Sequence, residues 1–318
     1  MTHPHMPPLV LDAAAVARHL PSVDVVAALR VMFADLGRGD AIQPPQTLTL
    51  LPGEAGDFIT YLGAIAGARV FGAKLSPYIV TPGAPIITAW TTLMSMDTGQ
   101  PLLLCDSGQL TTERTAGTTA LAVDCLAPAG ASVLAIIGSG KVALAHLRHV
   151  LPLRTWREVR VYSRRLNGNA ERQAEWAQFA PNVIFAESAE AAAMGAEVVM
   201  LCTSSGKPVI EAAAIAPGAL VTSISTNVAN AHEIAPGFLV GAEVYCDYHA
   251  TTPASAGEMK LATTDHSWSS DALRGDLAGL VAGTCARPSG GKPVFFRSIG
   301  LGLEDVCMAH AIWRVATH

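Results

Sequence analysis

The sequence predicts an α/β protein whose second half forms a parallel sheet with helices on both faces. From Ala131 onward, short runs rich in β-branched residues alternate with segments of helical periodicity, a pattern typical of strands buried on both faces. One of these strands leads directly into a glycine-containing turn that opens a helix. The chain has 318 residues, more than one domain usually contains, so we expect two domains.

The first third of the chain predicts a helix followed by an antiparallel or mixed sheet. Residues 12–36 have helical periodicity, with an apolar face formed by Val16, Leu20, Val25, Val26, Leu29 and Met32. Strand-like runs separated by Pro- and Gly-containing turns follow at residues 47–51, 58–62, 72–75, 86–94 and 102–105. Residues 111–126 then predict a helix.

The second half predicts an alternating series. Strands are expected at residues 132–137, 158–162, 183–185, 197–202, 220–225 and 243–246. Helices are expected at residues 141–150 and 170–179, in a short Ala-rich segment before residue 197, and from about Gly302 onward.

Composition narrows the function classes. The formal net charge of −5 argues against a nucleic-acid-binding protein, which would carry a basic stripe. Only 15% of residues are charged and mean hydropathy is positive, which favours a homo-oligomer with apolar surface buried between subunits. The six scattered cysteines form no CxxC pair and indicate reduced core residues of a cytoplasmic protein. We expect no signal peptide and no membrane span.

The turn at residues 138–143, with the sequence GSGKVA, predicts a dinucleotide site of the Rossmann type. Gly138 permits the tight turn, Gly140 lets the backbone approach a pyrophosphate, and the helix that follows offers free N–H groups to phosphate. A P-loop is excluded because the earlier glycine is missing and no Ser or Thr follows the lysine. The residues expected to contact the dinucleotide here are Gly138, Ser139, Gly140, Lys141 and Val142.

The end of the second strand favours NADPH, with NADH as a second cofactor. NAD sites usually place an acidic residue there to bind the ribose hydroxyls. Here the strand ends in Ser163, Arg164 and Arg165, whose hydroxyl and guanidinium groups suit a 2′-phosphate. The alternative is that both arginines are simply solvated.

Four motifs in order along most of the chain resemble the ornithine cyclodeaminase/μ-crystallin family. They are residues 72–74 (GAK), 110–116 (LTTERTA), the turn at Gly138 and residues 296–305 (FRSIGLGLED). A tract at Cys202, Thr203 and Ser204 matches the family's nicotinamide-side loop. The resemblance implies a Rossmann domain, here residues 127–295, inserted into a substrate-binding and dimerisation domain, residues 1–126 plus 296–318.

By the resemblance, Lys74 and Arg114 match the pair that binds the substrate carboxylate. A lysine among small and apolar residues is costly unless it is paired or functional, and arginine offers a two-pronged donor to a carboxylate. The alternatives are a surface lysine and a structural salt bridge from Arg114 to Glu113 or Asp106. Gly300 is also expected near the substrate.

Two departures from cyclodeaminases bear on the reaction. Gln46 stands where they carry an arginine, and Asn227 stands where they carry an aspartate. An amide cannot act as a general base, so cyclodeamination of ornithine is disfavoured. Asn227 is expected to hydrogen-bond the ring nitrogen of the substrate or the nicotinamide amide.

The segments at residues 223–234 and 257–259 resemble the Δ1-pyrroline-2-carboxylate/Δ1-piperideine-2-carboxylate reductases within the family. The sequence therefore predicts NAD(P)H-dependent reduction of cyclic imino acids to L-proline or L-pipecolate. Alternatives are ornithine cyclodeamination, an open-chain amino-acid dehydrogenase, and a non-catalytic ligand-binding protein of the crystallin type. The expected partner is a second copy of the chain.

Other polar residues carry weaker signals. His146 and His149 lie on one helix but lack a third metal ligand, so we expect no metal site. Asp247 ends a predicted strand and is either a site residue or a capping residue. Glu304 and Asp305 are expected to favour the N-terminus of the last helix, a structural role.

Overall fold

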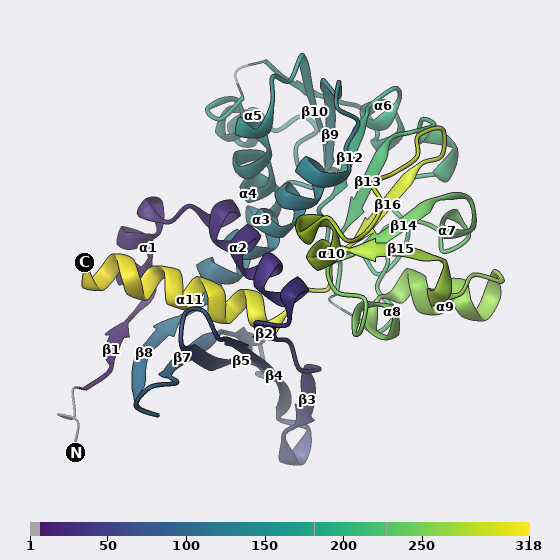
Figure 1. Cartoon of the computed structure of the whole chain (residues 1–318). Helices are drawn as coiled ribbons and strands as arrows, with labels where there is room; N and C mark the ends of the chain where they lie inside the picture. The colour runs from purple at the N-terminus through teal and green to yellow at the C-terminus, as the bar shows by residue number, and fades with distance from the viewer. Residues whose placement is uncertain (1–6, 181, 227) are drawn as a thin grey trace. The chain divides into compact units, whose positions relative to one another are not determined.

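The computed structural model describes residues 7–180, 182–226 and 228–318, which form two compact units. Unit 1 comprises the chain up to Arg114 together with Leu301–His318, and unit 2 comprises Thr115–Gly300. Within the described residues each unit contains an eight-stranded sheet (Figure 1). The two units are defined by contacts within the folded chain. The domain limits expected after residues 126 and 295 stay a prediction.

The sheet of unit 1 is antiparallel except at one edge. Its order is β1-β8-β7-β5-β4-β2, β3 pairs with β4, β6 pairs with β5, and only the β1–β8 pair among the described residues is parallel. The strands are β1 (Leu9–Leu11), β2 (Ala41–Ile42), β3 (Thr47–Leu50), β4 (Gly56–Ile65), β5 (Val70–Ile79), β6 (Ile86–Ile87), β7 (Trp90–Ser95) and β8 (Pro101–Asp106). The helices are α1 (Ala13–His19), α2 (Val25–Arg38) and α11 (Gly302–Thr317), and α3 (Gly108–Leu126) begins here.

Helix α11 covers one face of this sheet, where it packs on β4, β5 and β7 and against α2 (Figure 1). The two-residue alternation of a strand assigns side chains to the faces. In β5, Val70, Gly72 and Lys74 are buried, whereas Phe71 and Leu75 are exposed. The second face of the sheet therefore presents partly exposed apolar side chains.

The sheet of unit 2 is parallel in every pairing among the described residues, in the order β11-β10-β9-β12-β13-β16-β14-β15. Its strands are β9 (Val133–Ile137), β10 (Glu158–Tyr162), β11 (Val183–Phe185), β12 (Val198–Leu201), β13 (Leu220–Ser223), β14 (Glu243–Cys246), β15 (Leu273–Asp276) and β16 (Val294–Arg297). Its helices are α4 (Lys141–Val150), α5 (Ala170–Ala177), α6 (Ala189–Ala193), α7 (Phe238–Gly241), α8 (Thr252–Ser255), α9 (Gly257–Asp265) and α10 (Leu277–Ala282). The predicted α/β class with a parallel sheet is confirmed.

Several expected elements differ in detail. The single helix expected at residues 12–36 is wrong: a 3-10 turn at Leu20–Ser22 follows α1, and Asp24 caps a new helix by accepting a hydrogen bond from Ala27 N. The run at residues 86–94 is split into β6 and β7. Strand β16 was not predicted, although it lies between β13 and β14 in the sheet.

Among the described residues, the longest apolar helical stretches fall short of what a membrane span would require.

Candidate active site

The turn after β9 has the geometry of a phosphate-binding turn. Gly138 has φ 130°, and a Cβ atom at this position would lie 2.3 Å from the carbonyl oxygen of Cys202. Two features therefore exclude a side chain at this position: the backbone conformation of Gly138 and the carbonyl group of Cys202, which follows β12. Gly140 caps α4, and a Cβ there would meet nothing within 4 Å. The N-terminus of α4 is thus approachable by a dinucleotide, as the expected role of Ser139, Lys141 and Val142 requires.

The end of β10 is hydrogen-bonded to this turn. Ser139 Oγ donates to Ser163 Oγ over 2.8 Å, and Ser163 Oγ also accepts from the backbone N–H of Arg165 over 3.2 Å. Arg164 and Arg165 are exposed. Their side chains leave the Ser163 turn toward solvent, a placement compatible with binding a 2′-phosphate.

The loop after β12 is held by a residue that the sequence analysis missed. Glu233 is fully buried, and its Oε1 accepts from Thr203 N over 2.6 Å and from Thr203 Oγ1 over 2.7 Å. Its Oε2 accepts hydrogen bonds from Ser223 Oγ, Ile224 N and Ser225 N at 2.8–3.1 Å. Burial raises the pKa of Glu233, while the hydrogen bonds from Thr203 and Ile224 act in the opposite direction.

The expected cofactor residues of this loop differ in exposure. Cys202 is buried at the end of β12, where burial raises the pKa of its thiol well above the usual value, and Ser204 is exposed. A thiol with such a pKa stays protonated, so Cys202 acts as a packing residue whose backbone borders Gly138. Asn227, expected both as a catalytic and as a cofactor residue, lies outside the described residues.

In unit 1, Lys74 is a buried cation. Its side chain is 2% exposed, and Nζ lies 2.7 Å from Asp305 Oδ2, 3.4 Å from Thr111 Oγ1 and 4.1 Å from the centre of the Tyr61 ring. Burial lowers the pKa of Lys74 to about 8, and the attraction of Asp305 opposes this effect. The alternative of a solvated surface lysine is therefore wrong.

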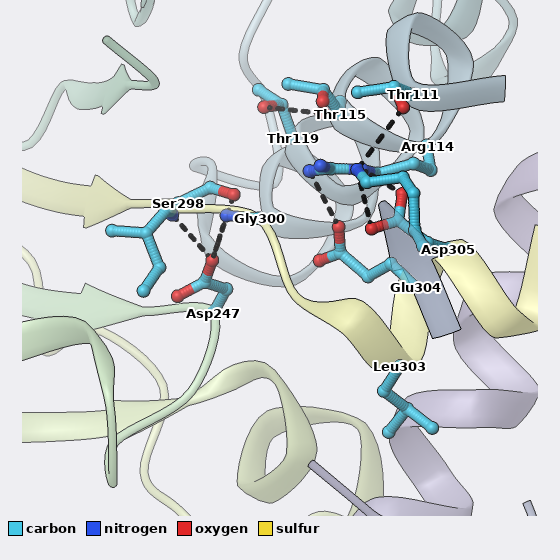
Figure 2. Close-up of polar contacts among 12 residues, drawn as sticks. Thr111, Arg114, Thr115, Thr119, Asp247, Ser298, Gly300, Leu303, Glu304 and Asp305 are labelled. Atoms are coloured by element: carbon cyan, nitrogen blue, oxygen red, sulfur yellow. Dashed lines mark hydrogen bonds and ion pairs between the residues drawn. The ribbon is translucent and has the colours of Figure 1, made fainter. Parts of the chain in front are cut away.

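Arg114 shares the same carboxylate. Arg114 Nε donates to Asp305 Oδ1 and Arg114 Nη1 donates to Glu304 Oε2, each over 3.2 Å (Figure 2). These carboxylates raise the pKa of Arg114 even though burial lowers it. The salt bridge allowed for in the sequence analysis does exist, but its carboxylates come from α11. Glu304 and Asp305 do lie in the first turn of α11, and they also pair with both expected substrate cations.

Close backbone packing brings these four charges together. A Cβ on Gly302 would lie 2.5 Å from Leu62 N, and a Cβ on Gly63 would lie 2.7 Å from Leu303 Cα, so the first turn of α11 rests directly on β4. Gln43 Oε1 accepts a hydrogen bond from Leu303 N over 2.8 Å and caps that turn. The following residues, Glu304 and Asp305, then meet the buried face of the sheet.

Gln46 lies in register with Tyr61 and Lys74, on neighbouring strands of the unit 1 sheet. Thr47 pairs with Thr60, and Tyr61 pairs with Lys74, so the residue before Thr47 lies beside Tyr61. Gln46 Oε1 is buried and accepts no hydrogen bond from any described residue. An acceptor in this state suits an N–H group of a ligand.

Asp247 and Gly300 have structural contacts in unit 2. Asp247 Oδ2 accepts from Ile299 N over 2.7 Å, from Gly300 N over 3.1 Å and from Ser298 Oγ over 3.0 Å (Figure 2). Asp247 is fully buried, so it acts as the capping residue allowed for in the sequence analysis. The expected role of Gly300 in substrate binding stays a prediction.

His146 is buried on α4, where it contacts Val142 O over 2.7 Å and Thr119 Oγ1 over 3.0 Å. A group of three or more His, Cys, Asp or Glu residues arranged for a metal ion is absent from the part of the chain that the structure describes. Both ring nitrogens of His146 thus have protein contacts.

Known proteins resemble this chain in sequence over almost its whole length. The pattern of the ornithine cyclodeaminase/mu-crystallin family matches residues 6–317. The NAD(P)H-dependent anabolic L-arginine dehydrogenase DauB of Pseudomonas aeruginosa is 52% identical over 308 residues, covering 97% of each chain. The ketimine reductase mu-crystallin of Mus musculus is 25% identical over 318 residues, covering 96% of each chain.

Two solved structures have the same fold. The probable ornithine cyclodeaminase of Bordetella pertussis superposes with a TM-score of 0.88 at 27% identity, covering 98% of this chain and 97% of that one. The Δ1-pyrroline-2-carboxylate reductase of Thermococcus litoralis, solved with NADH and L-proline, gives a TM-score of 0.87 at 21% identity, covering 97% of each chain. The relatives include NAD(P)H-dependent oxidoreductases. This chain belongs to the ornithine cyclodeaminase/mu-crystallin family.

Proposed function

We propose that this chain is an NAD(P)H-dependent oxidoreductase that interconverts an open-chain 2-imino acid and an L-amino acid, with L-arginine as the product. The observation that carries this proposal is the 52% identity, over 97% of both chains, to an NAD(P)H-dependent anabolic L-arginine dehydrogenase. A Δ1-pyrroline-2-carboxylate reductase from Colwellia psychrerythraea is 25% identical over 69% of this chain. The open-chain dehydrogenase, an alternative in the sequence analysis, therefore takes precedence over the cyclic imine reductase.

The reaction can be written with atoms and electrons in balance. Ammonium condenses with the 2-oxo acid 5-guanidino-2-oxopentanoate to give a protonated imine and water. Bound NAD(P)H supplies a hydride to C2, and the two electrons neutralise the iminium nitrogen as the C2–H bond forms. The products are L-arginine and NAD(P)⁺. Since the iminium is already electrophilic, the hydride step needs no general base.

Lys74 and Arg114 are proposed to orient the substrate carboxylate, which is catalysis by positioning. Both are at most 5% exposed, so an interaction with a carboxylate is only weakly screened by water. The buried Oε1 of Gln46 is proposed to accept a hydrogen bond from a substrate N–H group. Asn227 is proposed to bind the imine nitrogen or the nicotinamide amide.

The cofactor is proposed to lie along the Gly138 turn and the Thr203 loop. The fit rests on the Cβ-free approach at Gly140 and on the hydrogen bond between Ser139 and Ser163. We propose NADPH as the preferred cofactor because exposed Arg164 and Arg165 follow a strand end without a carboxylate. NADH is proposed as a second cofactor.

The apolar outer face of the unit 1 sheet is proposed to bind a second copy of the chain. The outward residues Leu62, Phe71, Leu75, Trp90 and Leu104 are 37–48% exposed. Contiguous apolar surface of this kind usually marks a subunit interface. A related archaeal alanine dehydrogenase has been solved as a dimer. We place this homodimer in the cytoplasm, where its six free cysteines would stay reduced.

A substrate panel tests the proposal. Oxidation of NADPH should be fastest with 5-guanidino-2-oxopentanoate plus ammonia, and Arg114→Ala should lower kcat/KM by about 100-fold or more through loss of a charged hydrogen bond. The second candidate, cyclic imine reduction, would give its highest kcat/KM with Δ1-pyrroline-2-carboxylate or Δ1-piperideine-2-carboxylate. The proposed substrate would be refuted if the protein turned over neither the oxo acid with ammonia and NADPH nor L-arginine with NADP⁺.

A further inference from the structure

Unit 2 contains buried charges that do not balance. Glu233 and Glu258 are fully buried and Arg297 is 1% exposed. Arg297 Nε lies 3.1 Å from Glu258 Oε2, so one carboxylate is paired with the guanidinium. Glu233 receives its hydrogen bonds from neutral N–H and O–H groups. We call the group formed by Glu233, Arg297 and Glu258 the acidic triad; with both carboxyl groups ionised it carries one net negative charge.

The members of the triad are linked through one residue of the loop after β13. Ser225 N donates to Glu233 Oε2 over 3.1 Å, and Ser225 O accepts from Arg297 Nη2. Helix α9 brings Glu258 to this point, since a Cβ on Gly257 would lie 2.2 Å from Ala231 O. Ser225, Glu233, Glu258 and Arg297, all buried, thus meet at one place.

Burial raises the pKa of Glu233, but its hydrogen bonds favour the ionised form, because every one of its partners is a donor. Five N–H and O–H groups point at its two oxygens, which is the arrangement that stabilises a carboxylate over a carboxylic acid. Two of these donors belong to Thr203, in the loop assigned to the nicotinamide side of the cofactor. The carboxylate of Glu233 is therefore fixed directly behind that loop.

We propose that the acidic triad stabilises the positively charged, oxidised nicotinamide relative to the neutral, reduced ring. This inference rests on the proposed function, because it needs the cofactor at the Thr203 loop. A fixed anion in a water-poor environment favours a cation nearby and has little effect on a neutral ring. Bound NADPH thereby becomes a better hydride donor, and NADP⁺ leaves more slowly. Glu233 is in this scheme a positioning residue that acts through the loop and through its charge.

The test compares two dissociation constants, those of NADP⁺ and NADPH, by isothermal titration calorimetry at fixed ionic strength. Glu233→Gln should raise the Kd of NADP⁺ about fivefold more than that of NADPH, because removing one negative charge in a partly screened site weakens the binding of the cation and has little effect on the neutral ring. Glu258→Gln should change the ratio in the same direction while keeping every hydrogen bond of Glu233, so it decides the question if Glu233→Gln does not fold.

Glu197→Gln is the matched control. Glu197 also accepts hydrogen bonds from several donors of unit 2, from Ser132 N over 2.6 Å and from Val133 N over 3.0 Å, but it lies at the amino ends of β9 and β12. Its substitution should leave the ratio of the two constants unchanged.

An equal rise of both dissociation constants in Glu233→Gln and in Glu258→Gln would overturn the inference and leave a purely structural role. Failure of the wild-type protein to bind either nucleotide would instead overturn the proposed function. The two failures are thus distinguishable in the same set of titrations.

Discussion

Replacing Asp305 with Asn removes the carboxylate that Lys74 and Arg114 share. Burial lowers the pKa of Lys74 to about 8, and Asp305, 2.7 Å from Nζ, is the main group that keeps this amine protonated. Without that charge the pKa of Lys74 falls further, because an opposite charge at such a distance changes a pKa by about 1–3. We expect the protonated, carboxylate-binding form of Lys74 to be lost above about pH 7 in the variant and above about pH 8 in the wild type.

The assay measures the inhibition constant of 5-guanidinopentanoate between about pH 6 and pH 9.5. Neither the carboxylate nor the guanidinium group of this inhibitor titrates in that range. If binding requires protonated Lys74, the inhibition constant should rise about tenfold for each pH unit above the midpoint. Asp35→Asn is the control, since Asp35 pairs with Arg38 on α2 and takes no part in the cluster. An unchanged midpoint in Asp305→Asn, or a flat wild-type profile up to pH 9.5, would refute this role of Lys74.

The same substitution should also destabilise the protein. Removing one partner from a buried ion pair typically costs about 3–5 kcal/mol, which for a chain of this size lowers Tm by on the order of 10 °C. The burial of Lys74 lowers the free energy of unfolding, because its folded-state pKa of about 8 lies below the usual value of 10.5. This penalty is complete below about pH 8 and declines as the pH rises toward 10.5, so stability should increase over that range. Thermal melts of both proteins at pH 7 and pH 9.5 measure these effects.

Three further substitutions test other parts of the site. Gly138→Ala should lower the free energy of unfolding by about 1–3 kcal/mol or more and abolish NADPH binding. Gly140→Ala, with open space around its Cβ, should retain the wild-type Tm. Equal melting curves for the two variants would contradict the turn geometry. Changing Arg164 and Arg165 together to Gln should raise the KM for NADPH about tenfold or more and leave the KM for NADH nearly unchanged, and a parallel rise in both would argue against a 2′-phosphate site. Leu75→Glu, on the exposed sheet face, should give a monomer in sedimentation velocity, and an unchanged mass would exclude this face as the interface.

The parts of the fold that the sequence predicted are those with local causes. The dinucleotide turn follows from one buried strand, two glycines and one helix within about twenty residues, so the pattern is complete without knowledge of distant segments. The break between α1 and α2 also has local signals, namely Pro21 in the 3-10 turn and Asp24 as the N-cap of α2. The continuous periodicity of residues 12–36 concealed them. Strand β16 was missed because its place between β13 and β14 depends on pairings such as Leu220 with Val294 and Glu243 with Val294, which join residues far apart in the sequence.

The buried carboxylates were missed for a related reason. A sequence shows Glu304 and Asp305 at a helix start, where acidic residues need no further explanation. Their pairing with Arg114 spans 190 and 191 positions and depends on Gly63 and Gly302 allowing two backbones to touch. Glu233 likewise shows its role only when the ends of β12 and β13 are brought together.

The charge balance of each unit indicates what each can stabilise. In unit 1, the charges of Lys74 and Arg114 are matched by those of Glu304 and Asp305, so an incoming carboxylate meets a neutral cluster and must compete with Asp305 for donors. Selectivity then depends on hydrogen-bond geometry and on the protonation of Lys74, since net attraction is absent. In unit 2, the acidic triad has one negative charge without a buried partner among its members. A charge of that sign favours the oxidised cofactor, which is the state produced when an imine accepts a hydride, and so it fits the proposed reductive direction of the reaction.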